Sequence, residues 1–329
     1  QPRSAGSNTS WLNPTIPTNI GTMLNTGWEL QFGVDILRTQ DFTWNLSLDA
    51  SFIDNTIKKL PGGNDIDNGS QRISEGHSIY EWYTYHYAGV DQMDGHALYE
   101  LDPNAYEFRS SANGEKNFQT KLENARSAGQ LREINGKYYV TTTNNASRDW
   151  RGTALPTVYG SFGTNFNWKG ITLGMLFTYS LGGKTWDSNY SSLMSVSQPN
   201  SLTSALHKDV LKAWTAAPEG MTAESPNRID PNGIPVFNFA QQVDNNGGSD
   251  RWLTSSDYLV FKNLNVSYAL PQKWVRALDM NQLSIGFSVD NLFTITARKG
   301  MNPQYSFSGG QSLNFVTARV FSFQINAKF

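Results

Sequence analysis

The last nine residues of the chain alternate without interruption between apolar and polar side chains. The apolar set is Phe321, Phe323, Ile325, Ala327 and Phe329, and the residues between them are Ser322, Gln324, Asn326 and Lys328. Successive side chains of a strand point to opposite faces, so the pattern predicts a strand with one apolar wall and one polar wall. Such strands occur in soluble β-sandwiches and in outer-membrane β-barrels, where an aromatic residue commonly marks the interface.

The same alternation occurs in six further segments, which form three predicted hairpins. Their ranges are 28–36 with 42–52, 158–168 with 171–181, and 258–270 with 283–293. Most of these segments reach the length of about 9–11 tilted residues that crosses the hydrocarbon core of a bilayer. With the closing strand at about residues 315–329, the pattern predicts seven strands.

The predicted connections alternate between short and long. Short ones follow residues 36, 168 and 270, whereas long ones fill about 54–157, 182–256 and 294–314. Outer-membrane barrels combine short periplasmic turns with long extracellular loops. The sorting favours an all-β membrane barrel over a sandwich, with extracellular loops and a periplasmic C-terminus.

Composition agrees with a barrel. Charged residues make up 16% of the chain, against about 25% in typical soluble domains, and aromatic residues reach 13%. Mean hydropathy is negative and no stretch of about 18 apolar residues exists, so no spanning helix is expected. A net charge of -2 argues against a nucleic-acid partner. The absence of cysteine excludes disulfides and thiolate metal sites.

The strand count predicts that the barrel is incomplete. Bacterial single-chain barrels have even counts of about eight strands or more. No signal peptide precedes the first strand, and the chain starts with Gln1-Pro2-Arg3-Ser4. We therefore expect residues 1–329 to be the C-terminal part of a larger barrel, without its plug and early strands. A weaker strand within 136–142 or 78–90 would restore an even count, and this is the basis of a small-barrel alternative.

Seven local strings, taken in order, carry a family resemblance. They are NIGTMLNTGWEL (19–30), YGSFGTNFNWKG (159–170), YSLGGKTWD (179–187), LHKDVLKAWT (206–215), DYLVFKNLNVSYALP (257–271), DNLF (290–293) and RVFSFQINAKF (319–329). The ordered series resembles the SusC-like branch of TonB-dependent outer-membrane transporters from Bacteroidetes-type bacteria. It covers nearly the whole chain.

The resemblance implies a large antiparallel barrel, with about 22 strands in outer-membrane transporters. It implies active import of oligomeric nutrients, either oligosaccharides or peptides, without catalysis and without a cofactor. The implied partners are a SusD-like surface lipoprotein that closes as a lid, outer-membrane lipid, and the N-terminal barrel and plug portion. TonB would act through that N-terminal portion, because no TonB box is present in this sequence.

Aromatic residues are frequent in the long predicted loops. Such rings can stack on the C–H faces of sugars or on apolar side chains of peptides. The predicted substrate-binding residues are Trp82, Tyr83, Tyr85, Trp186 and Asp187. Other loop rings are Tyr87, Tyr99, Tyr106, Trp150, Trp214 and Trp252. Rings of this kind also pack loops together or meet a partner protein. On the last strand, Phe321, Phe323, Ile325 and Phe329 are expected to face the membrane.

Two loop segments suggest other chemistry. Residues 65–69 carry two aspartates at calcium-loop spacing but lack the required glutamate, so we expect a turn and no metal site. His96 lies close in sequence to Asp91 and Asp94, which could activate water. No nucleophile elbow or paired-carboxylate motif accompanies it. A self-contained small barrel acting as a surface hydrolase is therefore the alternative hypothesis.

Overall fold

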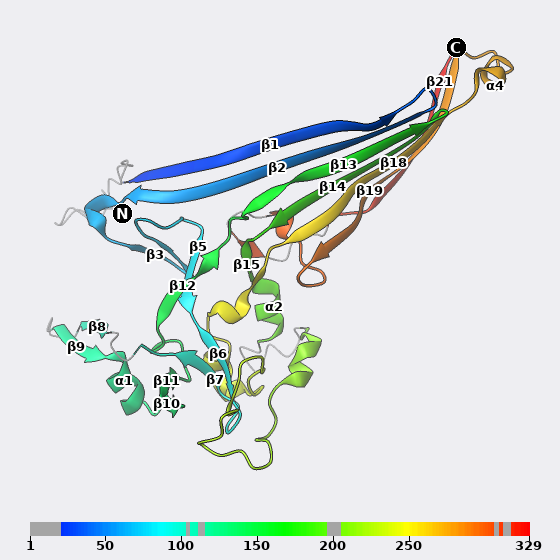
Figure 1. Ribbon diagram of the computed structural model, residues 1–329. Coiled ribbons are helices and arrows are strands. Elements are labelled where there is room, and N and C mark those ends of the chain that lie inside the picture. The colour runs from blue at the N-terminus through cyan, green and yellow to red at the C-terminus, as the bar shows by residue number, and fades with distance from the viewer. Residues whose placement is uncertain (1–20, 103–105, 111–115, 196–204, 306–308, 312–316) are drawn as a thin grey trace, which may run out of the picture.

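A computed structural model describes residues 21–102, 106–110, 116–195, 205–305, 309–311 and 317–329. Seven long strands form one sheet within these ranges (Figure 1). They are β1 (Thr22–Arg38), β2 (Phe42–Lys59), β13 (Val158–Trp168), β14 (Ile171–Leu181), β18 (Tyr258–Ala269), β19 (Gln282–Thr296) and β21 (Val320–Lys328). All neighbours pair antiparallel and in chain order. The seven predicted strands are confirmed, and β1 and β2 extend beyond their predicted ends.

One face of the large sheet is apolar across its full width. Paired residues of successive strands form rows, one of which is Leu48, Phe162, Phe177, Phe261 and Phe293. The ring centroids of Phe162 and Phe177 lie 4.8 Å apart, and those of Phe177 and Phe261 lie 4.4 Å apart. Register therefore aligns seven separate alternating segments into one continuous apolar wall.

The residues predicted to face the membrane lie on this wall or beside its end. Phe321, Phe323 and Ile325 of β21 are 60%, 84% and 75% exposed, and Phe329 after the strand is 78% exposed. Phe323 pairs with Phe287 of β19, and their ring centroids lie 4.9 Å apart. A wide exposed surface of aromatic and aliphatic side chains is unfavourable in water and fits the outer wall of a membrane barrel.

The opposite face of the sheet is polar and satisfies many of its own hydrogen bonds. Asp49 accepts a hydrogen bond from the Ser161 hydroxyl at 2.7 Å across β2 and β13. Asp290 accepts one from the Asn263 amide at 2.7 Å across β18 and β19. This face has the composition of a barrel's inner wall.

The short connections lie together at one end of the sheet, beside the C-terminus (Figure 1). Lys169 and Gly170 join β13 to β14 with φ angles of 47° and 87°. Positive φ at both positions suits a two-residue hairpin turn whose twist matches the strands. The turn from β18 to β19 contains α4 (Gln272–Arg276).

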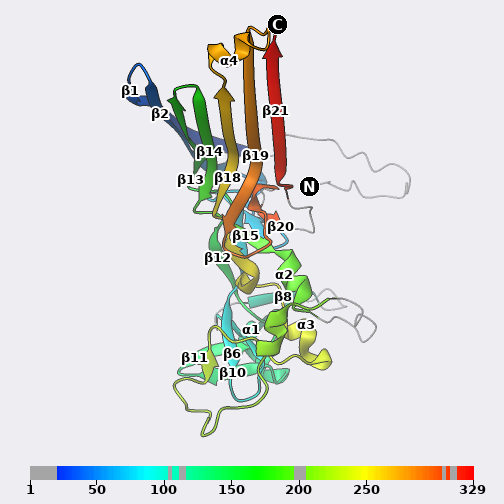
Figure 2. The ribbon, with the colours of Figure 1, turned by 90° about the vertical axis from the view of Figure 1, so that its right-hand side faces the viewer.

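The long connections fold into a separate body at the other end (Figures 1 and 2). It holds a five-stranded sheet of β10 (Leu131–Ile134), β11 (Lys137–Val140), β7 (Ala97–Glu100), β6 (Tyr87–Asp91) and β16 (Ile229–Asp230). A four-stranded sheet contains β12 (Arg148–Thr153), β5 (Glu81–Tyr85), β4 (Gln71–Ile73) and β3 (Ile66–Asn68). Smaller sheets pair β17 (Leu253–Ser255), β15 (Lys184–Asp187) and β20 (Gly310–Gln311), and β8 (Tyr106–Ser110) with β9 (Lys116–Thr120).

The body contains short helices and a hydrophobic core of its own. Its α-helices are α1 (Lys121–Ser127), α2 (Ser188–Leu193) and α3 (Gln242–Asn245). Short 3-10 helices are η1 (Pro61–Gly63), η3 (Lys208–Lys212), η4 (Phe239–Gln241), η5 (Asp250–Trp252) and η6 (Pro303–Tyr305). Val90, Tyr99 and Val140 are fully buried in the core. No helix in the described ranges is long and apolar enough to cross a bilayer.

The two segments considered for an eighth barrel strand belong to this body. Residues 137–140 form β11, and residues 81–85 and 87–91 form β5 and β6. All three pair within the smaller sheets and not with the seven long strands. The small-barrel alternative is therefore wrong about its extra strand. Among the residues that the structure describes, β1 and β21 each pair on one side of the large sheet only.

A charge on the apolar wall should destabilise the protein, whereas the same charge on the polar wall should not. Phe323→Lys is expected to lower the free energy of unfolding by about 2–4 kcal/mol, the cost of lysine near the bilayer midplane. Gln324→Lys, one residue away on the other face, is the matched control and should change it by less than about 0.5 kcal/mol. Urea unfolding in lipid vesicles measures both. Equal losses in the two variants would contradict the assignment of the faces.

Candidate functional site

Strand β5 divides the predicted substrate-binding residues between two faces. Tyr83 and Tyr85 are half-buried, whereas Trp82, which directly precedes Tyr83, is only 5% exposed. Alternation along the strand causes this separation, because neighbouring side chains point in opposite directions. The five predicted residues therefore do not form one cluster.

The half-buried side of the β5–β12 pair presents aromatic rings and guanidinium groups. Arg72 lies 3.8 Å from the ring centroid of Tyr83, and Arg148 lies 5.0 Å from it and 5.8 Å from that of Tyr85. The centroids of Tyr83 and Trp150 lie 5.0 Å apart in an edge-on arrangement. We call these five residues the aromatic–arginine face. Each exposed cation–π pair contributes roughly 0.5–1 kcal/mol, so rings and cations hold one another in place.

Hydrogen bonds fix the two arginines of this face. Arg72 Nε donates to Asp67 Oδ1 at 2.8 Å, and this hydrogen bond lowers the pKa of Asp67. Arg148 donates to the backbone carbonyls of Gly69 and Tyr83 at 2.5 and 2.6 Å. Residues 66–68 form β3 and not the expected turn, and only Gly69 belongs to the turn that follows; Asp67 and Gly69 of this segment hold the two arginines. Across the described residues, no group of three or more His, Asp or Glu side chains is placed to hold a metal ion.

A histidine extends the aromatic surface. The ring of His77 stacks on Trp150 with centroids 3.7 Å apart and planes 7° apart. His77 Nδ1 lies 2.6 Å from Oε2 of Glu81, which fixes the orientation of the imidazole. The sequence prediction did not include His77, since it is six residues from Tyr83 and its stacking partner lies far along the chain.

Trp82, Trp186 and Asp187 occupy a packed layer behind β5. The Trp82 indole donates to the carbonyl of Lys184 at 3.1 Å, and its ring centroid lies 6.0 Å from that of Trp186. Asp187 is 4% exposed and accepts a hydrogen bond from the backbone amide of Tyr190 at 3.0 Å, which caps α2. Its other oxygen pairs with Arg298 at 3.1 Å. These contacts join the smaller sheets to one another, so a role in binding substrate stays a prediction for these three residues.

The other loop rings that sequence singled out mostly pack the body. Tyr87, Tyr99 and Trp252 are buried. Burial raises the pKa of Tyr87 and of Tyr99 well above the ordinary value. The Trp214 indole donates to the carbonyl of Gln92 at 3.2 Å. The side chain of Tyr106 lies outside the described residues. Packing is therefore the observed contact of these four rings.

A groove adjoins the aromatic–arginine face. It has a volume of about 610 Å³, and its lining includes Arg148, Arg151, Glu100, Tyr138 and Tyr139. Arg151 lies 3.6 Å from Asp250 and 4.0 Å from Glu100, so both charge signs meet in this groove. Stacking rings beside paired charges suit an extended polar ligand that also has flat or apolar faces.

Hydrogen bonds beside this groove join residues that are far apart in the sequence. His86 Nδ1 lies 2.6 Å from Asp250 Oδ2, and the other oxygen of Asp250 accepts the backbone amide of Tyr87 at 2.8 Å. The hydrogen bond to Asp250 raises the pKa of His86 above its ordinary value. This pairing joins the first long connection to the second.

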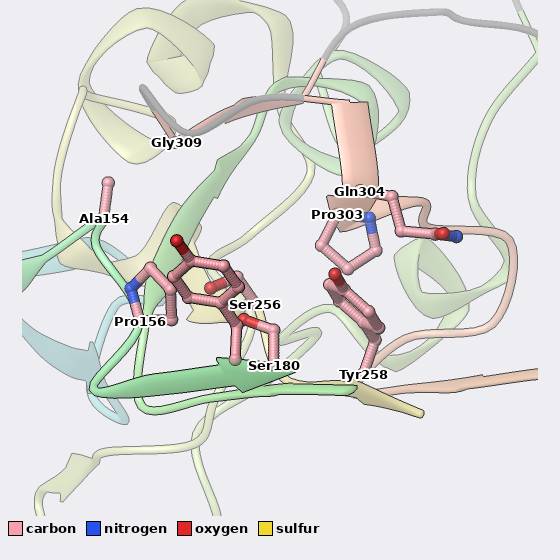
Figure 3. A pocket seen from close by; sticks show the side chains of 9 residues that line it. Ala154, Pro156, Ser180, Ser256, Tyr258, Pro303, Gln304 and Gly309 are labelled. Carbon is pink, nitrogen blue, oxygen red and sulfur yellow. The ribbon is translucent and has the colours of Figure 1, made fainter. Parts of the chain in front are cut away.

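A small cavity lies where the polar face of the large sheet meets the body (Figure 3). Its volume is about 40 Å³, enough for about one water molecule. Ser180, Ser256 and Tyr258 line it together with Gln304, whose side chain extends away from the three hydroxyl-bearing residues in Figure 3. Sequence alternation alone could not find it, because its residues come from four different segments.

The residues of the hydrolase alternative are held by arginines. His96 Nδ1 lies 3.1 Å from Asp94, as that hypothesis requires, but Asp94 also pairs with Arg132 at 3.1 Å. Hydrogen bonds from His96 and Arg132 lower the pKa of Asp94 despite its partial burial. Asp91 is fully buried and accepts hydrogen bonds from Arg228 at 2.9 and 2.6 Å. Such pairs fix the loops.

Comparison with curated proteins supports the family resemblance. The chain is 24% identical over 319 residues to TonB-dependent receptor P39 of Formosa agariphila, covering 89% of this chain and 28% of that protein. Over 333 residues it is 24% identical to TonB-dependent receptor P3 of the same organism, with 94% and 29% covered. It is 36% identical over 69 residues to TonB-dependent receptor SusC of Bacteroides thetaiotaomicron, with 20% and 7% covered. The predicted resemblance to SusC-like TonB-dependent receptors is confirmed.

Solved structures show the same fold. The RagAB peptide transporter aligns with a TM-score of 0.66 at 20% identity, over 94% of this chain and 30% of that chain. The RagAB peptide importer in the 'open-open' state aligns with a TM-score of 0.63 at 18% identity, with 94% and 29% covered. No family model matches the chain.

The length and the names of the curated relatives bear on the function of this chain. The chain spans less than a third of the length of the P39 and P3 receptors it matches. All three of these relatives are named as TonB-dependent receptors.

The pairing of His86 with Asp250 should stabilise the body more at acidic pH than at basic pH. Because the folded-state pKa of His86 is raised above 6.5, its contribution is complete below 6.5 and is lost as pH rises through the folded pKa. His86→Gln should therefore speed amide exchange in β6 several-fold at about pH 5.5 and much less at about pH 9. Hydrogen exchange read by mass spectrometry measures this, with His207→Gln as a distant control. An equal effect at both pH values would refute the charge pairing.

Proposed function

We propose that this chain is part of an outer-membrane importer that takes up oligomeric nutrients, either glycans or peptides. The observation that carries the proposal is the two-faced sheet joined at one end to a folded body that presents the aromatic–arginine face. The sheet supplies a membrane wall on one side and a polar inner wall on the other. The face and its groove supply rings and charges for cargo.

Residues 1–329 would form the C-terminal part of the barrel. Unpaired strand edges are not tolerated in lipid, so β1 and β21 require neighbouring strands. We propose that an N-terminal barrel and plug portion provides these strands, and that TonB supplies energy through the plug. In this division of the transporter, residues 1–329 contact the cargo, and the N-terminal plug portion couples import to TonB.

The proposed orientation places the body outside the cell and the C-terminus in the periplasm. The sorting of short and long connections to opposite ends of the sheet supports it, because outer-membrane barrels have short periplasmic turns. A SusD-like surface lipoprotein would then meet the body as a lid. The resemblance to SusC supports this partner.

The cargo class rests on the solved relatives and the charged groove. The two solved relatives are described as a peptide transporter and a peptide importer. Paired charges and aromatic rings in one groove suit peptides, and the rings alone also suit glycans. Peptides and glycans are therefore both tested for binding.

Purification from the native outer membrane tests the assembly. Intact-mass measurement and N-terminal sequencing of all co-purifying chains should find a plug-bearing portion and a lipoprotein with this chain. Finding this chain alone, folded and heat-modifiable in detergent, would overturn the importer proposal.

Removing one ring from the aromatic–arginine face should weaken cargo binding. Tyr83→Ala is expected to cost about 1 kcal/mol, or roughly five-fold in Kd, through lost stacking and loss of its cation–π contacts. Isothermal titration of the purified complex with peptide and oligosaccharide mixtures measures the change.

Trp274→Ala is the control for this measurement, since Trp274 is 56% exposed on α4 at the opposite end of the sheet. Both variants should retain the folded, heat-modifiable barrel. Equal affinity of Tyr83→Ala and the unaltered protein would remove Tyr83 from the cargo site.

A further inference from the structure

A groove interrupts the apolar face of the large sheet near the body. It has a volume of about 700 Å³ and lies where β14 and β19 end and β18 begins. Leu48, Phe162, Tyr179, Leu259 and Ile295 form its apolar walls. We propose that this groove binds one acyl chain of a membrane lipid whose head group donates hydrogen bonds to the groove's polar rim.

Strand register places the walls on the membrane side. Leu48 pairs with Phe162 in one row, and Tyr179 pairs with Leu259, which pairs with Ile295, in the next. Leu48, Phe162 and Ile295 are 43%, 38% and 58% exposed. The groove is therefore open along the apolar face and belongs to the wall that contacts hydrocarbon.

The location of the groove determines the chemistry of its occupant. A water molecule would find too few hydrogen-bond partners in an apolar groove within a bilayer. An unfilled groove would leave its lining side chains without van der Waals contacts on one side. The acyl chains of surrounding lipid are the material available at this face of a membrane barrel. A chain seated in the groove would restore those contacts.

The Tyr179 and Phe162 side chains of the groove are held in fixed positions. A groove of fixed shape can bind one lipid chain, whereas a mobile protein surface would contact only exchanging lipids. The Tyr179 hydroxyl donates to the backbone carbonyl of Asp49 at 3.1 Å. The ring of Phe162 stacks on Phe177, which in turn stacks on Phe261. These contacts fix the shape of the groove before lipid binds, so less ordering accompanies binding.

The rim nearest the body is polar and acidic. Ser255, Asp257 and Thr296 lie there, and no residue in the described lining carries a positive charge. Asp257 Oδ1 accepts the backbone amide of Gly182 at 2.6 Å, and the Thr296 hydroxyl donates to the carbonyl of Arg298 at 2.8 Å. A carboxylate beside an apolar groove favours a head group with N–H or O–H donors over one without them.

Two lipids with the same acyl chains test this head-group preference. Phosphatidylethanolamine carries an ammonium group that donates hydrogen bonds, whereas phosphatidylcholine carries a quaternary ammonium group that cannot. The protein purified from its outer membrane is placed in nanodiscs of each lipid and in an equal mixture. Native mass spectrometry then counts the lipids that remain after the nanodisc is removed.

We expect one retained phosphatidylethanolamine per protein and at least a five-fold preference over phosphatidylcholine. Leu48→Trp fills the groove and should lower retention at least five-fold. Val266→Trp adds the same ring to the same face outside the groove lining and should not. Asp257→Asn keeps an acceptor oxygen for Gly182 and should abolish the head-group preference while retaining a bound chain.

Equal lipid retention by Leu48→Trp and Val266→Trp would show that the groove is not the binding site. A head-group preference that is unchanged in Asp257→Asn would show that the polar rim does not select the head group. A measurement on the unaltered protein covers the case in which Leu48→Trp does not fold. Phosphatidylethanolamine with a photoreactive acyl chain should label 179–181, 258–259 and 295–297 above all other segments of the apolar face. Labelling spread along that face in proportion to exposure would refute an ordered site.

Discussion

Backbone hydrogen bonding in lipid is the constraint on which this structure depends. A bilayer offers no partner for a free N–H or C=O group, so strands that cross it must pair with one another along their length. The seven long strands meet that requirement by pairing antiparallel in chain order. Once pairing is fixed, alternation leaves two faces, and each must match a different environment. The Phe162–Phe177–Phe261 stack and the Asp49–Ser161 hydrogen bond lie on opposite sides of the same strands.

The same constraint explains why chemistry is concentrated at one end. Within the bilayer, each strand position is either a lipid contact or a part of the inner wall. Connections outside the hydrocarbon are free to grow, and the three long ones fold into a body with several sheets and a buried core. The aromatic–arginine face is built there on three neighbouring strands, β12, β5 and β4, and its two arginines are already held by backbone carbonyls and by Asp67. Its rings are therefore presented in a fixed arrangement.

Alternation predicted the large sheet well and the body poorly, for one physical reason. A strand between lipid and a polar interior repeats every two residues, and this signal is local in sequence. The body instead depends on distant pairs, such as His86 with Asp250, which are 164 residues apart. Sequence did contain one usable local signal there. Because β5 also alternates, Trp82 had to face away from Tyr83 and Tyr85, and a two-residue period would have divided the predicted site correctly.

A polar space and an apolar space lie closest to each other at the boundary between the large sheet and the body. Tyr258, the first residue of β18, lines the small polar cavity on one side of the sheet and the apolar groove on the other. Asp257 beside it closes the turn from β14 by accepting the amide of Gly182. The first residue of β18 is therefore a common wall of the outer groove and the inner cavity, and the dense packing at this strand end separates an apolar space from a polar one.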